Sequence, residues 1–283
     1  MFSSKQSVVL AVAAVLFGCA CAAPNPGAND IQLNQKLSIE AKGAKQPIDT
    51  RAVNERYPYA VRSFGGFCGG TIISPTWILT AGHCSILYAG SGLPAGTNIT
   101  EVSSLYRFPK RLVIHPLFSI GPFWLNATEF NFKQVAARWD FLLIELEEPL
   151  PLDGKILAAA KLDDQPDLPA GLDVGYPSYS TDTYAVTTLS ELHGKDLSVQ
   201  SNEVCSKLDQ FKAEDMLCAK GRPPRYDFAC IGDNGSGLVD NNGRLVGVMS
   251  WAENDAFECR NGNLVVFSRV SSVREWIRQV TNI

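Results

Sequence analysis

Short apolar runs separated by turn residues are the feature that most constrains the fold of this chain. The clearest runs cover residues 67–73, 77–81, 112–114, 141–146 and 245–250. They are rich in Val, Ile, Leu, Phe or Trp and are bounded by Gly, Pro, Asn or Asp, which is typical of strands in a barrel or sandwich. With 46% hydrophobic residues, the 283-residue chain also lacks the low hydrophobicity of disordered proteins. The sequence therefore predicts an all-β fold.

Two local signals mark the C-terminal part of the chain. Asn241-Asn242-Gly243 precedes a strand-like run and predicts a hairpin, because these residues tolerate positive φ. Ser272 and Glu275 have the spacing of a helix capping box. An apolar stripe accompanies them at helical spacing, formed by Val273, Trp276, Ile277 and Val280. The stripe predicts a C-terminal helix packed on the β body, with a partner-binding or membrane-surface helix as the alternative.

The charge balance excludes one class of partner. The chain has 25 basic and 29 acidic residues, which gives a formal net charge of −4. A domain that follows a phosphate backbone normally concentrates a basic excess on one face. We therefore expect no nucleic-acid partner.

The first residues have the three parts of a secretory signal peptide. Lys5 is followed by the apolar run 8–17, and small residues end at Ala20-Cys21-Ala22. The run is shorter than the about 20 apolar residues that span a bilayer, so we expect no membrane span. The predicted organisation is a signal peptide over residues 1–22, a pro-segment or extended arm over 23–51 and one domain over 52–283. We expect a secreted, extracellular protein.

Six cysteines remain after residues 1–22 are removed. An even number in an exported chain favours disulfides, and the spacings lack the paired C-x-x-C of a zinc site, so no metal is expected. Spacing alone permits 15 pairings of six cysteines. The six are Cys68, Cys84, Cys205, Cys218, Cys230 and Cys259.

Several motifs in one chain order carry a resemblance to a known family. Residues 67–73 read Phe-Cys-Gly-Gly-Thr-Ile-Ile, 79–84 read Leu-Thr-Ala-Gly-His-Cys, 139–146 read Trp-Asp-Phe-Leu-Leu-Ile-Glu-Leu, 232–238 read Gly-Asp-Asn-Gly-Ser-Gly-Leu, 248–251 read Val-Met-Ser-Trp and 266–270 read Val-Phe-Ser-Arg-Val. Together they resemble trypsin-like and chymotrypsin-like serine proteases, peptidase family S1, over nearly the whole chain after Pro58. The resemblance implies two six-stranded antiparallel β-barrels with a C-terminal α-helix.

The resemblance also implies roles for individual residues. In such proteases a histidine takes the proton of a serine hydroxyl, and a buried carboxylate orients the histidine. His83 and Asp140 match the histidine and the carboxylate, and Gly232 matches an oxyanion-hole position. The implied disulfides are Cys68–Cys84, Cys205–Cys218 and Cys230–Cys259. No cofactor is expected.

The nucleophile position departs from the family pattern. Where the family reads Gly-Asp-Ser-Gly-Gly-Pro, this chain has Asn234 in place of the serine. A carboxamide has no proton that His83 could remove to make an attacking oxygen, so it cannot form an acyl-enzyme. Ser236 lies two residues further along the chain, and a misplacement of about 1 Å can already cost a hundredfold in rate. We expect a protease fold with little or no protease activity.

The specificity pocket departs from the pattern too. The implied lining residues are Phe228 at the base, six residues before the nucleophile position, and Ser250, Trp251, Ala252 and Val265 at the walls. Ala252 and Val265 replace glycines that leave room for a substrate side chain, so we expect protein atoms to fill the pocket. If the loop carries one extra residue, Asp227 reaches the base instead and the pocket favours Lys or Arg.

The features of activation by cleavage also depart from the family pattern. Active relatives are cut before a start resembling Ile-Val-Gly-Gly, and the new amine pairs with the aspartate beside the nucleophile, here Asp233. Arg51 is the best candidate cut site, but no such tetrad follows it and the arm from Ala52 to Pro58 is short. We therefore expect amine insertion to fail, which leaves Asp233 unpaired, solvated or held by another group.

Surface features add three expectations. Asn98 and Asn126 begin glycosylation sequons in expected surface loops, whereas the sequon at Asn234 is expected to be buried and unmodified. Aromatic residues in the segment 121–126 suit either a partner site or inward packing, and inward packing is preferred.

The sequence thus predicts a secreted protease homologue that acts by binding. We expect its partners to be other extracellular proteins, such as proteases or their substrates, with the chain as cofactor, decoy or modulator. The resemblance implies roles like those of such homologues in arthropod immune cascades or venoms. The alternatives are an active serine endopeptidase and a module that binds carbohydrate or microbial surfaces.

Overall fold

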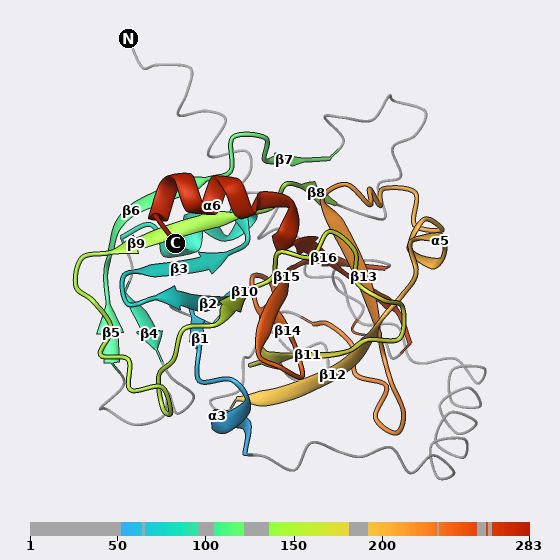
Figure 1. Cartoon of the computed structure of the whole chain (residues 1–283), viewed down its shortest axis with the longest axis horizontal. Coiled ribbons are helices and arrows are strands. Elements are labelled where there is room, and N and C mark those ends of the chain that lie inside the picture. The colour runs from blue at the N-terminus through green and yellow to red at the C-terminus, as the bar shows by residue number, and fades with distance from the viewer. Residues whose placement is uncertain are drawn as a thin grey trace, which may run out of the picture. The chain divides into compact units, whose positions relative to one another are not determined.

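Two β-sheets make up most of the described chain (Figure 1). The computed structural model describes residues 52–63, 66–90, 92–95, 105–121, 136–180, 192–230, 232–253, 259 and 262–283. The predicted signal peptide, the arm to residue 51, Asn98, Asn126 and the segment 122–135 lie outside this part, so the predictions about them stay predictions. No helix among the described residues is long and apolar enough to cross a bilayer.

The N-terminal sheet curls because its two end strands are consecutive in the chain. Its strands are β1 (Ala60–Arg62), β2 (Gly69–Ser74), β3 (Trp77–Thr80), β4 (Leu93–Ala95), β5 (Leu105–Arg107), β6 (Pro109–Ile114) and β9 (Leu142–Leu146). They pair in the order β5-β4-β1-β2-β3-β9-β6. Only Phe108 separates β5 from β6, so the sheet must bend until its two ends approach each other, as a half-barrel does.

The C-terminal sheet closes on itself. Its strands are β10 (Lys161–Leu162), β11 (Asp173–Ser178), β12 (His193–Val199), β13 (Met216–Gly221), β14 (Gly237–Asp240), β15 (Arg244–Ala252) and β16 (Leu264–Arg269). The pairing order is β10-β15-β14-β11-β12-β13-β16, and β15 also pairs with β16, which completes a ring of six strands. β10 is an added seventh strand that runs parallel to β15. A short two-stranded sheet joins β7 (Ser119–Ile120) to β8 (Ala137–Arg138).

The predicted all-β architecture with a C-terminal helix is confirmed, with corrections of detail. The C-terminal sheet contains the predicted closed barrel of six strands, with β10 added in parallel to β15, whereas the N-terminal sheet has seven described strands and forms a half-barrel rather than a closed six-stranded barrel. All five apolar runs contain strand residues, and the predicted hairpin joins β14 to β15. Gly243 takes a φ of 73° there, which explains the glycine at that turn.

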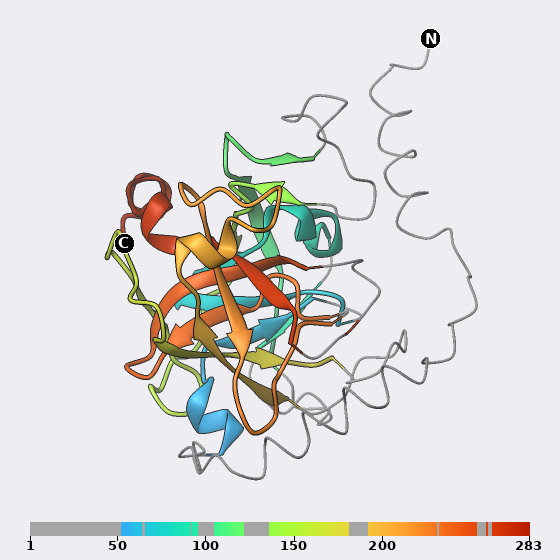
Figure 2. The ribbon, with the colours of Figure 1, turned by 90° about the vertical axis from the view of Figure 1, so that its right-hand side faces the viewer.

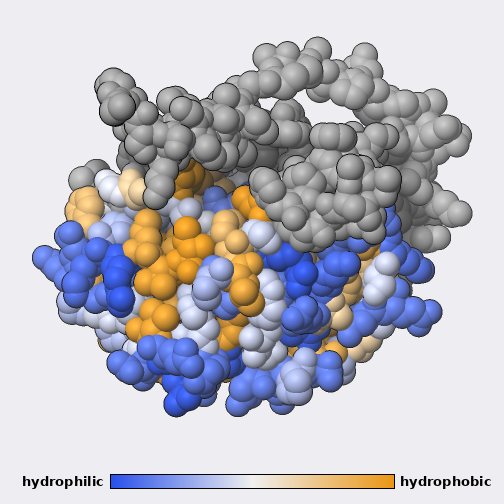
Figure 3. Space-filling view, turned by 90° about the horizontal axis from the view of Figure 1, so that it is seen from above, coloured by the Kyte–Doolittle hydropathy of each residue, from blue (hydrophilic) through white to orange (hydrophobic). Residues whose placement is uncertain are grey.

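The helices are short and lie at the edges of the sheets. They are α3 (Val53–Arg56), η2 (Gly82–Cys84), α4 (Ser85–Tyr88), α5 (Asn202–Cys205), η3 (Val270–Val273) and α6 (Arg274–Thr281). Figures 1 and 2 show α3 beside β12 at the bottom of the view and α6 at the top, where it lies over the N-terminal sheet. Figure 3 looks onto the side that carries α6, where apolar side chains gather. Exposed large apolar residues of the described chain include Ile114 and Leu117.

The C-terminal helix packs as predicted but begins differently. Val273 and Ile277 are buried in the core of the N-terminal sheet, and Trp276 and Val280 pack against it, so the apolar stripe faces the β body and is not presented to a partner or a membrane surface. The predicted capping box is wrong as well. Ser272 lies in η3, where its hydroxyl donates to the carbonyl of Arg269, and the α6 N-cap is Val273 with no side-chain cap. The 3-10 turn that precedes α6 shifts the start of the helix past the serine.

Candidate active site

Two neighbouring strands bring His83 and Asp140 together. β3 and β9 are antiparallel, with Thr80 opposite Leu142, so the end of β3 meets the start of β9. His83 lies in η2 just after β3, and Asp140 lies just before β9. The His83 ring Nδ1 is 2.7 Å from Asp140 Oδ2, and the His83 backbone N–H donates to Asp140 Oδ1 at 2.9 Å. Two contacts to one carboxylate set both the position and the rotation of the imidazole.

Burial and charge act in opposite directions on this pair. Asp140 is fully buried, and its Oδ2 also accepts a 2.6 Å hydrogen bond from the Ser250 hydroxyl. Burial alone raises the pKa of the Asp140 carboxyl, but His83 and the hydrogen bonds from His83 and Ser250 lower that pKa below its ordinary value. Burial alone lowers the pKa of the His83 ring, and the Asp140 carboxylate raises it above its ordinary value. The pair is therefore arranged to stabilise a protonated imidazole, as a general base requires.

The loop that carries Asn234 is fixed between the two sheets. The Gly69 N–H of β2 donates to the Asn234 carbonyl at 2.7 Å, and the Gly235 N–H donates to the Met249 carbonyl of β15 at 2.8 Å. Gly235 has a φ of 77°, and an added Cβ would collide with the Thr80 side chain. Gly232, matched to the oxyanion hole, also has positive φ, at 101°. Asn234 itself is half-buried, less enclosed than the sequence predicts.

Ser236 points toward the N-terminal sheet. Its side chain is buried, and a Cβ on Gly69 of β2 would collide with its hydroxyl. Within the described part of the chain, no serine hydroxyl lies within hydrogen-bonding distance of the His83 ring. The structure thus gives Ser236 a packing position against Gly69, and no hydrogen bond joins its hydroxyl to the His83 ring.

Four donors hold the Asp233 carboxylate, which is fully buried. Three are hydroxyls on or just after β11: Ser178 to Oδ1 at 2.5 Å, and Tyr176 and Ser180 to Oδ2 at 3.1 Å each. The fourth is the Cys230 backbone N–H at 2.9 Å. Burial raises the pKa of Asp233 above its ordinary value, although the Lys195 charge and these hydrogen bonds oppose the rise. Of the three outcomes predicted for Asp233, the structure shows that other groups hold it.

The residues matched to the specificity pocket are almost all buried. Phe228, Ser250 and Trp251 are each less than 9% exposed, Val265 is fully buried, and Ala252 is half-buried. Ala252 lies opposite Val265 across β15 and β16, and both belong to one apolar cluster with Ala229 and Phe267. The Lys195 Nζ lies 5.0 Å from the centre of the Phe228 ring. Side chains of the barrel therefore occupy the space around these positions.

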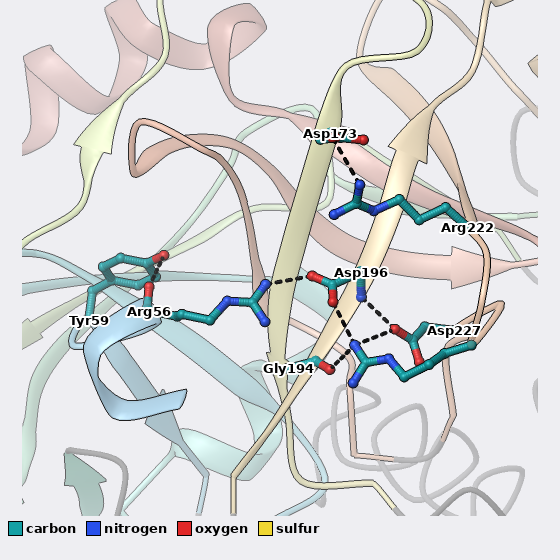
Figure 4. Close-up of polar contacts among 8 residues, drawn as sticks. Arg56, Tyr59, Asp173, Gly194, Asp196, Arg222 and Asp227 are labelled. Carbon is teal, nitrogen blue, oxygen red and sulfur yellow. Dashed lines mark hydrogen bonds and ion pairs between the residues drawn. The ribbon is translucent and has the colours of Figure 1, made fainter. Parts of the chain in front are cut away.

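Asp227, the alternative pocket base, is engaged elsewhere. Its Oδ2 accepts the Asp196 backbone N–H at 2.7 Å and the Arg225 guanidinium at 2.8 Å (Figure 4). Burial raises the pKa of Asp227 above its ordinary value, and these partners oppose the rise.

The structure contains the three disulfides Cys68–Cys84, Cys205–Cys218 and Cys230–Cys259, the pairs that the resemblance implies. This bears on metal binding. Cys68, His83 and Cys84 place their potential ligand atoms within 4.8 Å of one another. The two sulfurs are bonded to each other, so neither is a thiolate that could ligate zinc. These three residues do not fit a metal site.

Some partners of the site residues carry no local sequence signal. Tyr176, Ser178 and Ser180 lie more than 50 residues before Asp233 in the chain. The sequence predicts Ser250 only as a pocket residue, yet it also hydrogen-bonds Asp140 across 110 residues. Strand pairing in the closed barrel, rather than spacing, brings these groups together.

Comparisons with known proteins agree with the fold and with the family that the motifs resemble. The sequence matches the Trypsin family over residues 48–277. It is 59% identical to Scolexin B of Heliothis virescens over the whole of both chains. It is 31% identical to Glucanase inhibitor protein 3 of Phytophthora infestans, over 76% of this chain and 78% of that protein. The solved structure of neuropsin, a mouse serine protease, has a TM-score of 0.66 at 20% identity, over 81% of this chain and 96% of neuropsin. That likeness supports a chymotrypsin-like fold.

Proposed function

We propose that this chain, which belongs to the trypsin family of serine proteases, acts by binding other proteins rather than by cleaving them. The observation that carries the proposal is Asn234 at the nucleophile position. His83 and Asp140 keep their mutual geometry, but no described serine hydroxyl reaches the His83 ring. Loss of the nucleophile costs about six orders of magnitude in turnover in another triad enzyme.

The pocket residues support the same proposal independently. Val265 is fully buried in an apolar cluster, and Ala252 packs against that cluster at a position where the resemblance implies glycine. A substrate side chain could enter only if these groups moved, and a close-packed interior resists such movement. Substrate binding in the manner of an active relative is thus disfavoured even before the chemistry begins.

The proposed setting is extracellular, with the chain as a cofactor, decoy or modulator of proteases or their substrates. Three disulfides and the signal-peptide pattern of residues 1–22 support secretion. One relative at 31% identity is named an inhibitor of a glucanase, so the family includes proteins named for inhibiting another enzyme. An extracellular immune process or a venom is the proposed context.

Labelling with a fluorophosphonate probe tests the absence of a nucleophile. The purified chain should show no more labelling than a heat-denatured sample, and His83→Gln should leave that level unchanged. Covalent labelling of the folded chain that disappears in His83→Gln would overturn the proposal and favour an active endopeptidase.

Restoring a serine hydroxyl at position 234 tests the effect of the missing nucleophile separately from the effect of the pocket. Asn234→Ser should be labelled weakly or not at all and should hydrolyse no peptide substrate, because the filled pocket still excludes the substrate side chain. If Asn234→Ser alone hydrolyses peptides, the pocket is open and our account of Ala252 and Val265 is wrong. The absence of a nucleophile in the natural chain would then still stand.

The binding function needs a positive test. Cleavage of a protein substrate by an active trypsin-like protease should change in rate when the folded chain is added. A reduced and alkylated sample, which cannot fold around its three disulfides, serves as the matched control. The assay is repeated with several trypsin-like proteases, with and without their protein inhibitors. If the folded and the alkylated samples give equal cleavage rates in every case, that result counts against a modulator or decoy.

A further inference from the structure

A cavity of about 190 Å³ lies beside the C-terminal sheet, and none of its lining residues is matched to the catalytic or specificity positions. It is enclosed by the loop 167–170 before β11, by residues 199–202 at the end of β12 and the start of α5, and by one residue each of β13 and β16. β13 and α5 lie side by side (Figure 1). The Gly171 N–H donates to the Val199 carbonyl at 2.8 Å, and the Val199 N–H donates to the Leu172 carbonyl at 2.9 Å, so the loop is fixed to β12. An apolar cavity of about 150 Å³ holds a benzene molecule, so this cavity has room for a group of the size of an amino-acid side chain.

Arg269 of β16 lines the buried part of this cavity. The residue is 6% exposed, whereas Asp167 and Asn202 at the mouth are exposed. Its Nε–H and one Nη2–H donate to the Met216 carbonyl at 3.3 and 3.1 Å, and one Nη1–H donates to the Pro166 carbonyl at 2.8 Å. A guanidinium has five N–H groups in all. The others have no acceptor in the part of the chain that the structure describes, so Arg269 can still donate to a ligand.

The charge of Arg269 has no carboxylate in direct contact. Among the described residues, no carboxylate oxygen lies within 4.0 Å of its guanidinium. Burial lowers the pKa of Arg269 below its ordinary value, although Asp167 and Asp163 oppose this fall from a distance. Asp163 pairs with Arg244, and Asp167 is exposed to water. Buried charges in proteins are normally paired, so the cavity lacks a negative group at its inner end.

The walls and the mouth of the cavity differ in polarity. Leu168, Val199 and Leu217 form the walls, and they belong to or pack against one apolar cluster of the barrel. At the mouth, the Asn202 side-chain amide makes no hydrogen bond in the described chain, so it is available to a peptide group. A matching ligand therefore has a carboxylate, an apolar group beside it and a peptide group next to both. The last residue of a polypeptide combines these three groups.

We propose that the cavity binds the C-terminal residue of a peptide or protein that ends in an apolar side chain. The terminal carboxylate accepts the remaining N–H groups of Arg269, the side chain packs on the apolar walls, and the last peptide group lies against Asn202. Asp167 repels the carboxylate only weakly, because water screens an exposed charge. The inference does not depend on Asn234 or on the filled specificity pocket, so it and the proposed function can fail separately.

An NMR titration of the purified, disulfide-bonded chain tests the proposal. N-acetyl-Gly-Leu should bind with a dissociation constant of about 1 mM or tighter and shift the Arg269 Nε–H signal. The same peptide with a C-terminal amide should bind at least about tenfold more weakly, because the charge-assisted hydrogen bonds are lost. Equal binding of the acid and the amide, or no shift of the Arg269 signal up to about 10 mM peptide, would overturn the proposal.

A second ligand separates a peptide terminus from a small carboxylic acid. 4-Methylpentanoate has the same carboxylate and a similar branched apolar group but no peptide group, so it should bind more weakly than N-acetyl-Gly-Leu. If it binds equally well, the peptide group contributes nothing and the assignment to a polypeptide terminus is wrong.

Three variants locate the carboxylate. Arg269→Gln should weaken binding of the acid at least about tenfold and leave binding of the amide unchanged. Asp167→Asn should tighten binding of the acid about two- to fivefold, because it removes a repelling charge at an exposed position that the fold does not need. Asp164→Asn is the matched control, since Asp164 is also exposed but does not line the cavity.

The opposite signs of these effects keep the proposal open to refutation even if Arg269→Gln does not fold. If Asp167→Asn weakens binding of the acid, or if Asp164→Asn changes it as much as Asp167→Asn does, the carboxylate does not lie in this cavity and the inference is wrong.

Discussion

At the scale of single residues, the same side chain behaves differently according to its partners. Asp140 and Asp233 are both fully buried carboxylates. Asp140 faces the His83 ring, and its pKa is lowered, whereas burial raises the pKa of Asp233 even though the Lys195 charge and the hydrogen bonds to Asp233 oppose the rise. The balance between burial and the partners of each carboxyl decides the direction of the shift.

The histidines offer a direct check of this contrast. Asp140 raises the pKa of His83, whereas burial lowers the pKa of His115, whose ring stacks on Trp139 at 5.3 Å. Titration followed by NMR should therefore place the His83 pKa above that of His115. The reverse order would contradict the pairing of His83 with an ionised Asp140.

The His83 shift also predicts a pH dependence of stability. Because the pKa is raised in the folded state, the protonated ring stabilises the fold at pH values below its unfolded pKa of about 6.5. That contribution disappears as the pH rises through the folded pKa. The loss in unfolding free energy caused by His83→Gln should therefore be larger near about pH 6 than near about pH 9. Urea denaturation at both values measures it, and equal losses would contradict the prediction.

At the scale of elements, hairpin geometry and strand pairing explain most of the local structure. Asp240 Oδ1 accepts the N–H groups of Asn242 and Arg244, which closes the turn between β14 and β15. Gly243 in that turn has positive φ, and a Cβ added there would meet no neighbouring atom within 4 Å among the described residues. The turn therefore needs glycine for its backbone and not for space.

This distinction gives a prediction for the hairpin. Gly243→Ala should lower the free energy of unfolding by about 1 kcal/mol, because an L-residue is strained in the left-handed region. Gly243→Asn should cost less, since asparagine tolerates that conformation. Denaturation of the two variants side by side measures the difference. A larger loss for Asn than for Ala would show that the turn is held by something other than backbone conformation.

At the scale of the whole domain, glycines at the crossing of the two sheets position the site. A Cβ on Gly69 of β2 would collide with Ser236, and one on Gly237 of β14 would collide with Thr71 of β2. The core beneath them is shared, since Val239, Leu245 and Val248 of the C-terminal sheet pack with residues of the N-terminal sheet. The loop of Asn234 is thus placed by the contact between sheets.

Gly237→Ala tests this contact. The new methyl group meets Thr71 and Leu245 from two different sheets, and overpacking of this kind typically costs about 1 to 3 kcal/mol. Gly243→Ala is a reference for backbone strain without overpacking, because Gly243 has positive φ and no described residue lies within 4 Å of the added atom. Thermal unfolding should show a larger loss for Gly237→Ala. If Gly237→Ala and Gly243→Ala lose the same stability, the two sheets can move apart at Gly237 at little cost.

Much of the fold and part of the site could be predicted from the sequence. The strand-like runs, the hairpin and the apolar stripe of α6 are local patterns, and each appears in the structure. His83, Asp140 and Asn234 could be identified from the sequence because each lies in a motif, and the motifs follow one another in the order that the family has. The three hydroxyl donors to Asp233 and the attachment of Arg56 to Asp196 could not be predicted, because their partners lie from about 50 to 140 residues apart in the chain.

The sequence by itself determined that this chain has the carboxamide of Asn234 in a motif that resembles the one in which the protease pattern has serine, because the type of side chain is read directly from the sequence. It also determined the class of fold, since strand periodicity is local. Only the tertiary structure decided how Asp233 is held and where the segment after Ala52 lies. Buried carboxylates must find donors, and in a closed barrel the available donors are set by strand register, which no local pattern encodes.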